Sequence, residues 1–185
     1  MSVDRTTDGE DIPVFFIYRS VEEATENEEH LSTFGIKYVR FEVSTFIFDV
    51  PSDNLMDARV ISRGFRHSNL LSVTNESCGP IMNRDPIQIP FPVHEFEKFL
   101  FAIAMMKHER DLGVFDPSDL CTILKLADYF ESLNLMQRVF SQINAHLKGK
   151  TPSEICEVFN IRSDFNHSQT NQMKREGLWH FNTSS

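Results

Sequence analysis

The chain has 185 residues, of which 41% are hydrophobic, and a formal net charge of −9. This length suits one domain with a small appendage. A non-specific nucleic-acid binder needs a basic patch that neutralises phosphates, and the acidic balance argues against that class. The longest apolar run, Phe99 to Met106, is too short to cross a bilayer, so we expect no membrane association.

The N-terminal part of the sequence changes character twice. Residues 1–11 are polar, do not have the pattern of a signal peptide and are expected to be partly disordered. Ile12 to Tyr18 is an apolar run that predicts a strand or a docked segment. The following stretch is expected to be a solvated linker or a short exposed helix, and its acidic residues are Glu22, Glu23, Glu26, Glu28 and Glu29.

Three further short strands are predicted before the helical part of the chain. Residues 37–43 alternate between polar and apolar types, which is typical of a half-buried strand, and residues 46–50 form a second one. Residues 55–62 are expected to form a short helix and residues 65–71 a helical turn. Residues 87–89 are the third strand, closed by a proline.

Helical patterns occupy the remainder. Val93 to Lys107 is apolar on most sides and is expected to be central to the core. Asp116 followed by Pro117 favours the start of a second helix. A third helix carries the apolar stripe Leu135, Met136, Val139, Phe140, Ile143 and Leu147. Strands followed by helices indicate the α+β class. The side chains that we expect to be largely buried are Phe48, Phe96, Leu100, Ile103, Leu124, Val139 and Ile143.

No combination of residues in the sequence predicts a catalytic site, a disulfide or a metal site. The three cysteines lie far apart and the seven histidines stand singly, so we expect neither a disulfide nor a metal site. Cys121 is expected to be a buried, unreactive thiol. No nucleophile, base and oxyanion donor come together in the sequence, so we expect a protein that is not an enzyme and needs no cofactor. The widely spaced thiols favour a cytoplasmic or nuclear location.

The C-terminal third carries a distinctive run. Lys148-Gly149-Lys150-Thr151-Pro152-Ser153-Glu154-Ile155 is followed by Phe159-Asn160-Ile161, by Asp164-Phe165, and then by Arg175-Glu176 and Trp179. In order and spacing this run resembles the S-phase-kinase-associated protein 1 family, the F-box adaptors of SCF ubiquitin ligases. Upstream, residues 47–50, 86–90 and 126–133 are similar to strands and helices of the same family.

The resemblance implies a BTB/POZ-type core, a small sheet flanked by helices, at residues 36–148. It implies F-box-binding helices at 149–185, preceded by an N-terminal extension at 1–35. The F-box-binding residues that it implies are Val139, Ile143, Ile155, Phe159, Ile161, Phe165, Met173, Glu176 and Trp179. The cullin-binding residues that it implies are Lys107, His108, Asp128 and Tyr129.

One departure affects the expected partners. The family presents a neutral Asn-Tyr pair towards cullin, whereas this chain has Asp128 and Tyr129. Cullin binding is therefore expected to be weaker than that of a typical member of the family, and Asp128→Asn is expected to improve it. Two alternatives stay open: an F-box-binding protein with little or no cullin binding, and a BTB module that forms a homodimer by exchanging the strand Ile12 to Tyr18.

Overall fold

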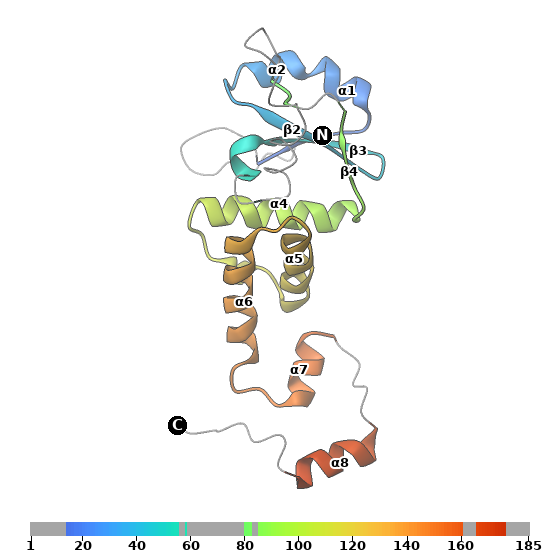
Figure 1. Ribbon diagram of the computed structural model, residues 1–185, viewed down its shortest axis with the longest axis vertical. Helices are drawn as coiled ribbons and strands as arrows, with labels where there is room; N and C mark the ends of the chain where they lie inside the picture. The colour runs from blue at the N-terminus through green and yellow to red at the C-terminus, as the bar shows by residue number, and fades with distance from the viewer. Residues whose placement is uncertain (1–13, 56–57, 59–79, 83–84, 161–165, 177–185) are drawn as a thin grey trace.

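The computed structural model describes residues 14–55, 58, 80–82, 85–160 and 166–176. Its centre is a four-stranded sheet of β1 (Phe16–Tyr18), β2 (Tyr38–Val43), β3 (Phe46–Pro51) and β4 (Ile87–Ile89), in the order β1-β3-β2-β4. Helices lie on both sides of this sheet, and those of the C-terminal part extend away from it (Figure 1). The arrangement confirms the predicted α+β class and its BTB/POZ-type core.

The sheet grows from one hairpin. β2 and β3 pair antiparallel through the turn at Ser44 and Thr45, and Ser44 adopts a positive φ of 59° there. β1 adds antiparallel to the free edge of β3, with Ile17 opposite Phe48. β4 adds parallel to β2, with Glu42 opposite Gln88. The apolar run predicted as a strand is therefore paired at Phe16–Tyr18, while its first two residues lie outside the described part.

The larger core lies between one sheet face and the helices. α4 (Val93–Lys107) crosses this face, and α5 (Pro117–Tyr129) and α6 (Leu133–Leu147) form a helical hairpin behind it (Figure 1). The ring of Phe96 packs edge-on against Phe41 and Phe48, at centroid distances of 5.4 and 5.3 Å. Phe99 and Phe130 stack at 4.7 Å, which joins α4 to the end of α5. Phenylalanine rings thus link the sheet, α4 and the end of α5.

Most of the predicted core residues are buried. Phe48, Phe96 and Val139 have no exposed surface, and Leu100 and Ile103 are 1% exposed. The two others, Leu124 and Ile143, are half-buried and pack against the edge of the core. α5 begins where predicted, because Asp116 accepts a hydrogen bond from the amide of Asp119 at 2.7 Å.

The other sheet face is covered too, which the sequence reading did not foresee. The acidic stretch forms two short helices, α1 (Val21–Glu26) and α2 (Glu28–Ser32), and these lie over the sheet opposite α4 (Figure 1). Ala24 and Leu31 are fully buried, so neither a solvated linker nor a wholly exposed helix describes this segment. A second, smaller core forms there, from Phe16, Tyr18, Ala24, Leu31, Tyr38 and Ile47.

Shorter elements complete the description. Ser52–Leu55 form a 3-10 helix, η1, and Leu112–Val114 form another, η3, between α4 and α5. The helix expected over residues 55–62 lies almost entirely outside the described residues, and so does the helical turn expected over 65–71. Beyond α6 the chain forms α7 (Pro152–Val158) and α8 (His167–Arg175).

Candidate functional site

α6 has three different sides. Leu135 and Val139 are fully buried in the main core. A second side faces the end of α4 and η3, where Arg138 donates to the carbonyl oxygen of Met106 at 3.3 Å and Gln142 donates to the Asp111 carboxylate at 2.7 Å. The third side carries an apolar stripe at helical spacing. We call it the α6 stripe, and it consists of Leu133, Met136, Phe140, Ile143 and Leu147.

The α6 stripe is only partly covered. Phe140 is 48% exposed and Leu133 is 41% exposed, whereas the other three side chains are half-buried. A phenylalanine ring that remains half in water on a well-formed helix leaves apolar surface available for a partner. The sequence analysis placed Phe140 in one apolar stripe together with Val139. Successive residues of a helix are about 100° apart, and that spacing could have shown that the two side chains face different ways.

α7 follows α6 after a sharp turn. Gly149 has a positive φ of 76°, which glycine adopts without steric cost, and it ends α6. Thr151 and Glu154 then form a capping box: the Glu154 carboxylate accepts from the Thr151 amide at 2.7 Å, and the Thr151 hydroxyl accepts from the Glu154 amide. The hydrogen bonds that the Glu154 carboxylate accepts from the Thr151 amide and from the Thr151 hydroxyl lower the pKa of this carboxyl. The start of α7 is therefore fixed, as the sequence predicted.

The predicted F-box-binding residues divide into three groups. Ile143 of α6, Ile155 of α7 and Phe159, which directly follows α7, are half-buried, so each keeps some surface for a partner. Val139 has no exposed surface at all, and a fully buried side chain has nothing to offer a partner. We therefore remove Val139 from the proposed interface and assign it to the support of α6.

The remaining F-box-binding candidates belong to the last part of the chain. α8 begins with reciprocal hydrogen bonds between Asn166 and Gln169, both at 2.9 Å. Met173 lies in α8, and Glu176 follows it as an exposed residue that accepts from Gln172 at 2.7 Å. The other three candidates, Ile161, Phe165 and Trp179, lie outside the described residues.

Two of the cullin-binding candidates lie at the end of α5. Asp128 is exposed, and Tyr129 is 43% exposed. The Tyr129 ring meets the Phe91 ring edge-on at 5.0 Å, and the Lys125 ammonium lies 5.1 Å from the Phe91 ring centre. Packing against Phe91 holds Tyr129 in place while its outer half stays in water. Leu133 begins α6 just beyond it and extends the exposed apolar surface at this corner.

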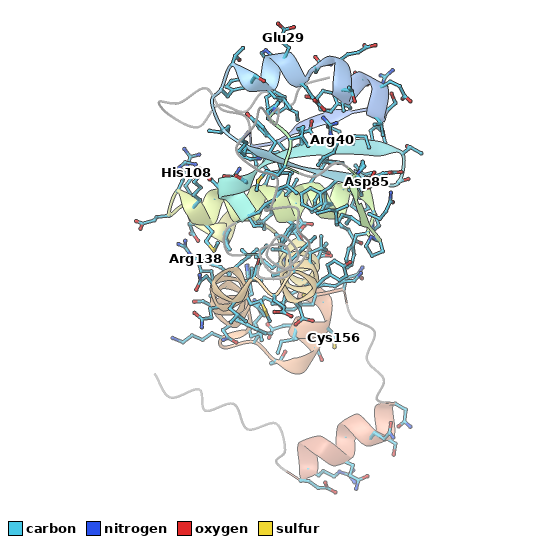
Figure 2. The ribbon with its side chains drawn as sticks, turned by 45° about the horizontal axis from the view of Figure 1, so that its top comes forward. Glu29, Arg40, Asp85, His108, Arg138 and Cys156 are labelled. Carbon is cyan, nitrogen blue, oxygen red and sulfur yellow. The ribbon has the colours of Figure 1, made fainter. Side chains whose placement is uncertain are left out.

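The other two cullin-binding candidates lie elsewhere. Lys107 ends α4 and donates to the Asn54 side-chain oxygen at 3.2 Å, and His108 follows it as an exposed residue (Figure 2). Phe91, which contacts Tyr129, precedes the other end of the same helix. α4 has 15 residues, and a helix of that size is about 21 Å long. The structure thus separates Lys107 and His108 from Asp128 and Tyr129 by roughly the length of α4.

Reactive groups are sparse in the part of the chain that the structure describes. Within these residues no three His, Cys, Asp or Glu side chains are grouped so that they could hold a metal ion. Cys121 is exposed, so the prediction that it is buried was wrong, although partial desolvation raises the pKa of its thiol. Across the same described ranges, no helix has both the length and the apolar character needed to cross a membrane.

Comparison with known proteins finds a family match for the C-terminal helices. Residues 142–180, from the second half of α6 onwards, match the family model described as Skp1 family, dimerisation domain. The C-terminal helices are therefore similar to the Skp1 family. The match confirms the resemblance drawn from the sequence. It includes Ile143 and Leu147 of the α6 stripe and the capped start of α7, whereas the more exposed Leu133 and Phe140 precede it. We call residues 142–180 the Skp1-family segment.

Similar proteins come from plants and from a slime mould. SKP1-like protein 1A of Arabidopsis thaliana is 32% identical over 73 residues, which are 40% of this chain and 46% of the relative. SKP1-like protein 18 of the same plant is 32% identical over 75 residues, 39% of this chain and 48% of the relative. The SCF ubiquitin ligase complex protein SKP1a of Dictyostelium discoideum is 29% identical over 72 residues, 39% of this chain and 44% of the relative. The chain thus spans less than half the length of these Skp1-family relatives.

Proposed function

We propose that this chain is an adaptor subunit of an SCF-type cullin-RING ubiquitin ligase, which bridges an F-box protein to a cullin scaffold. The observation that carries the proposal is the Skp1-family segment at residues 142–180, joined to an apolar stripe that α6 leaves half exposed. One of the Skp1-family relatives bears the name of an SCF ubiquitin ligase complex protein. The adaptor would act by geometry alone, without a catalytic group or a cofactor, in the cytoplasm or the nucleus.

The F-box protein would bind along α6, α7 and α8. Phe140 and Ile143 offer apolar surface on α6, and Ile155 and Phe159 offer it on α7. Large aromatic side chains that become desolvated at the centre of an interface carry much of its binding energy. The capping box at Thr151 fixes where α7 starts, so less conformational entropy is lost when a partner binds. Ile161, Phe165, Met173, Glu176 and Trp179 complete the proposed F-box surface.

The cullin would meet the corner where α5 ends. Tyr129 supplies an aromatic ring that is already oriented by Phe91, and Leu133 adds apolar surface beside it. Asp128 places a carboxylate at the edge of this patch. In the free protein water solvates the Asp128 carboxylate. A cullin surface without a hydrogen-bond donor at this point would displace that water and offer no hydrogen bond in its place. An ionised group left buried without a partner destabilises a complex by about 1–3 kcal/mol or more.

An F-box-binding protein with little cullin affinity is the second candidate function. Two observations favour it: Asp128 carries a charge at the proposed contact, and Lys107 and His108 lie at the far end of α4 from Tyr129. The two functions differ in one measurable quantity, the affinity for cullin. We therefore expect Asp128→Asn to strengthen cullin binding and to leave F-box binding unchanged, because the substitution removes the charge and keeps the size of the side chain.

A pair of calorimetric titrations tests the proposal. The full chain is titrated with an F-box domain and separately with a cullin N-terminal domain, and both titrations are repeated with Asp128→Asn. Glu29→Gln, which removes an exposed charge in α2 on the other side of the sheet from α5, is the control. Binding of both domains supports the bridging adaptor, and binding of the F-box domain alone by both forms supports the second candidate. Absence of F-box binding would refute both.

A further inference from the structure

α1, α2 and the turn after them, residues 21–35, form a small layer over the sheet face opposite α4, and we call this layer the cover (Figure 1). It is joined to β1 on one side and to β2 on the other. β1 itself belongs to the sheet, because it is paired with β3. The cover can therefore move without disturbing the strand order, provided that its contacts with the sheet are few and its two connections can turn.

The cover buries little apolar surface against the sheet. Only Ala24 and Leu31 of the two helices are fully buried, and Phe34 is partly buried against the Phe16 ring at 5.8 Å. The opposite face of the same sheet is covered by a helix that buries Phe96, Phe99 and several aliphatic residues. Hydrophobic stabilisation scales with the apolar area removed from water, so the cover is held far more weakly than α4.

Polar groups take the place of apolar contacts under the cover. Arg40 is 4% exposed and lies between the sheet and the two helices (Figure 2). Its guanidinium donates to both oxygens of the Asp49 carboxylate at 2.8 Å, directly across from β2 to β3. It also donates to the carbonyl oxygen of Ala24 in α1 at 3.3 Å and to the carboxylate of Glu28 in α2 at 2.9 Å. One side chain of the sheet thus binds both helices of the cover.

The closed cover also keeps several polar groups away from water. Burial raises the pKa of the Asp49 carboxyl, although the Arg40 guanidinium works against that effect. Burial likewise raises the pKa of the Tyr38 hydroxyl to about 12, and that of the Tyr18 hydroxyl still further. Neither hydroxyl finds a hydrogen-bond partner among the described residues. Desolvated polar groups oppose burial, so these groups favour an open state in which water reaches them.

We propose that the cover is a hinged lid on the sheet, and that the contact between Glu28 and Arg40 is its latch. Gly35 has a positive φ of 66° with no atom within 4 Å of the place that a Cβ would take, so the chain can turn there. Opening separates α1 and α2 from the sheet and gives access to Tyr38, Ile47 and the Arg40–Asp49 pair. Opening leaves the main core intact, because none of its buried residues belongs to the cover.

The latch can be tested without breaking the sheet. The Glu28 side chain is 33% exposed and contacts Arg40 from the cover side only, whereas Asp49 keeps both of its hydrogen bonds to Arg40. Glu28→Gln weakens the latch and leaves the buried pair in place. Glu29→Gln is the matched control, because Glu29 is the adjacent residue of α2, is exposed and points away from the sheet (Figure 2).

Native-state hydrogen exchange of the full chain, measured by NMR, reports the opening. The amides of Leu31 and Phe34 are hydrogen-bonded inside the cover, and that of Ala24 is hydrogen-bonded to the Ser20 carbonyl just before it. Helices of six and five residues do not stay formed away from the sheet, so opening exposes all three amides, which serve as probes with the β2 and β3 amides as a reference. We expect the three probes to exchange faster than the reference and with one common opening constant. Glu28→Gln should accelerate the probes by about three- to tenfold, since partly exposed ion pairs contribute modestly, and Glu29→Gln should not.

A second variant does not depend on the ion pair. Leu31→Ala removes the largest apolar side chain that α2 buries, and it should accelerate the same probes by at least the same factor while the reference amides keep their rates. Exchange of the probes at the rate of β2 and β3 would show that the cover unfolds only with the whole domain, and the proposal would be wrong. Equal effects of Glu28→Gln and Glu29→Gln would overturn the assignment of the latch.

Discussion

Phe140 and Val139 are neighbours in α6 with opposite surroundings, and replacing each by alanine separates binding from stability. Phe140 is 48% exposed, whereas Val139 has no exposed surface. A large aromatic side chain can bury about 150–250 Å², so roughly half of that area remains free on Phe140. At about 25 cal/mol per Å² the free half is worth about 2 kcal/mol when a partner covers it. Phe140→Ala should therefore weaken F-box binding by roughly 30-fold.

The paired variant gives the opposite result. Val139→Ala leaves a cavity in the main core and should lower the free energy of unfolding by about 2 kcal/mol, with a smaller effect on F-box affinity. Phe140→Ala should lower that free energy by about 1 kcal/mol or less, because the ring is only half packed. Calorimetric titration with an F-box domain and chemical denaturation measure the two quantities. If Phe140→Ala lowers stability as much as Val139→Ala does and leaves F-box affinity unchanged, Phe140 is a core residue and the α6 stripe is not an interface.

Three further outcomes follow from single residues. Trp179→Ala should weaken F-box binding by about tenfold or more in the same titration and change cullin affinity by less than about twofold; equal losses in both would show a structural role instead. Glu131 has a positive φ of 52° just after α5, where the Ser132 amide donates to the Ala127 carbonyl at 2.8 Å and the Glu131 amide donates to the Asp128 carbonyl at 3.0 Å. Glycine adopts this conformation without steric cost, so Glu131→Gly should raise the free energy of unfolding by about 0.5–1 kcal/mol. Gln137→Gly, inside α6, should lower the free energy of unfolding by about 1 kcal/mol. A loss of stability in both variants would show that the positive φ of Glu131 does not cost stability. The capping hydrogen bonds lower the pKa of Glu154 in the folded state, so their contribution is present above the unfolded pKa and is lost as pH falls through the lower, folded value. NMR shifts of α7 should therefore show fraying below about pH 4 in the wild type and little pH dependence in Glu154→Gln.

Sequence patterns predicted the helical half of the chain because its signals are local. The cap at Asp116 and the capping box at Thr151 each depend on residues three positions apart, and both form as the sequence indicates. The strand at Phe16–Tyr18 is similarly visible as an apolar run. What it pairs with is not local: it joins β3, some thirty residues later, and no pattern within the run determines that choice.

The layer over the second sheet face was missed for a physical reason. Only Ala24 and Leu31 of α1 and α2 are fully buried, which is too few to produce a helical period among charged residues. Arg40 alternates with apolar neighbours along β2, so it has the pattern of a side chain that faces solvent. It is buried because Asp49 lies directly opposite on β3 and Glu28 reaches it from α2. A contact among three segments of the chain produces no recognisable sequence pattern within any one of them.

The two proposed binding surfaces share one rigid support. α5 and α6 form a helical hairpin whose buried residues, among them Leu126, Leu135 and Val139, belong to the main core. Tyr129 lies at the turn of that hairpin, and Phe140 lies on its second helix, seven residues beyond Leu133 and so about 10 Å along the axis. Close packing does not let such a unit deform continuously. A partner at the α6 stripe and a partner at Tyr129 are therefore held at a fixed relative position, which is the property that an adaptor without catalytic groups requires.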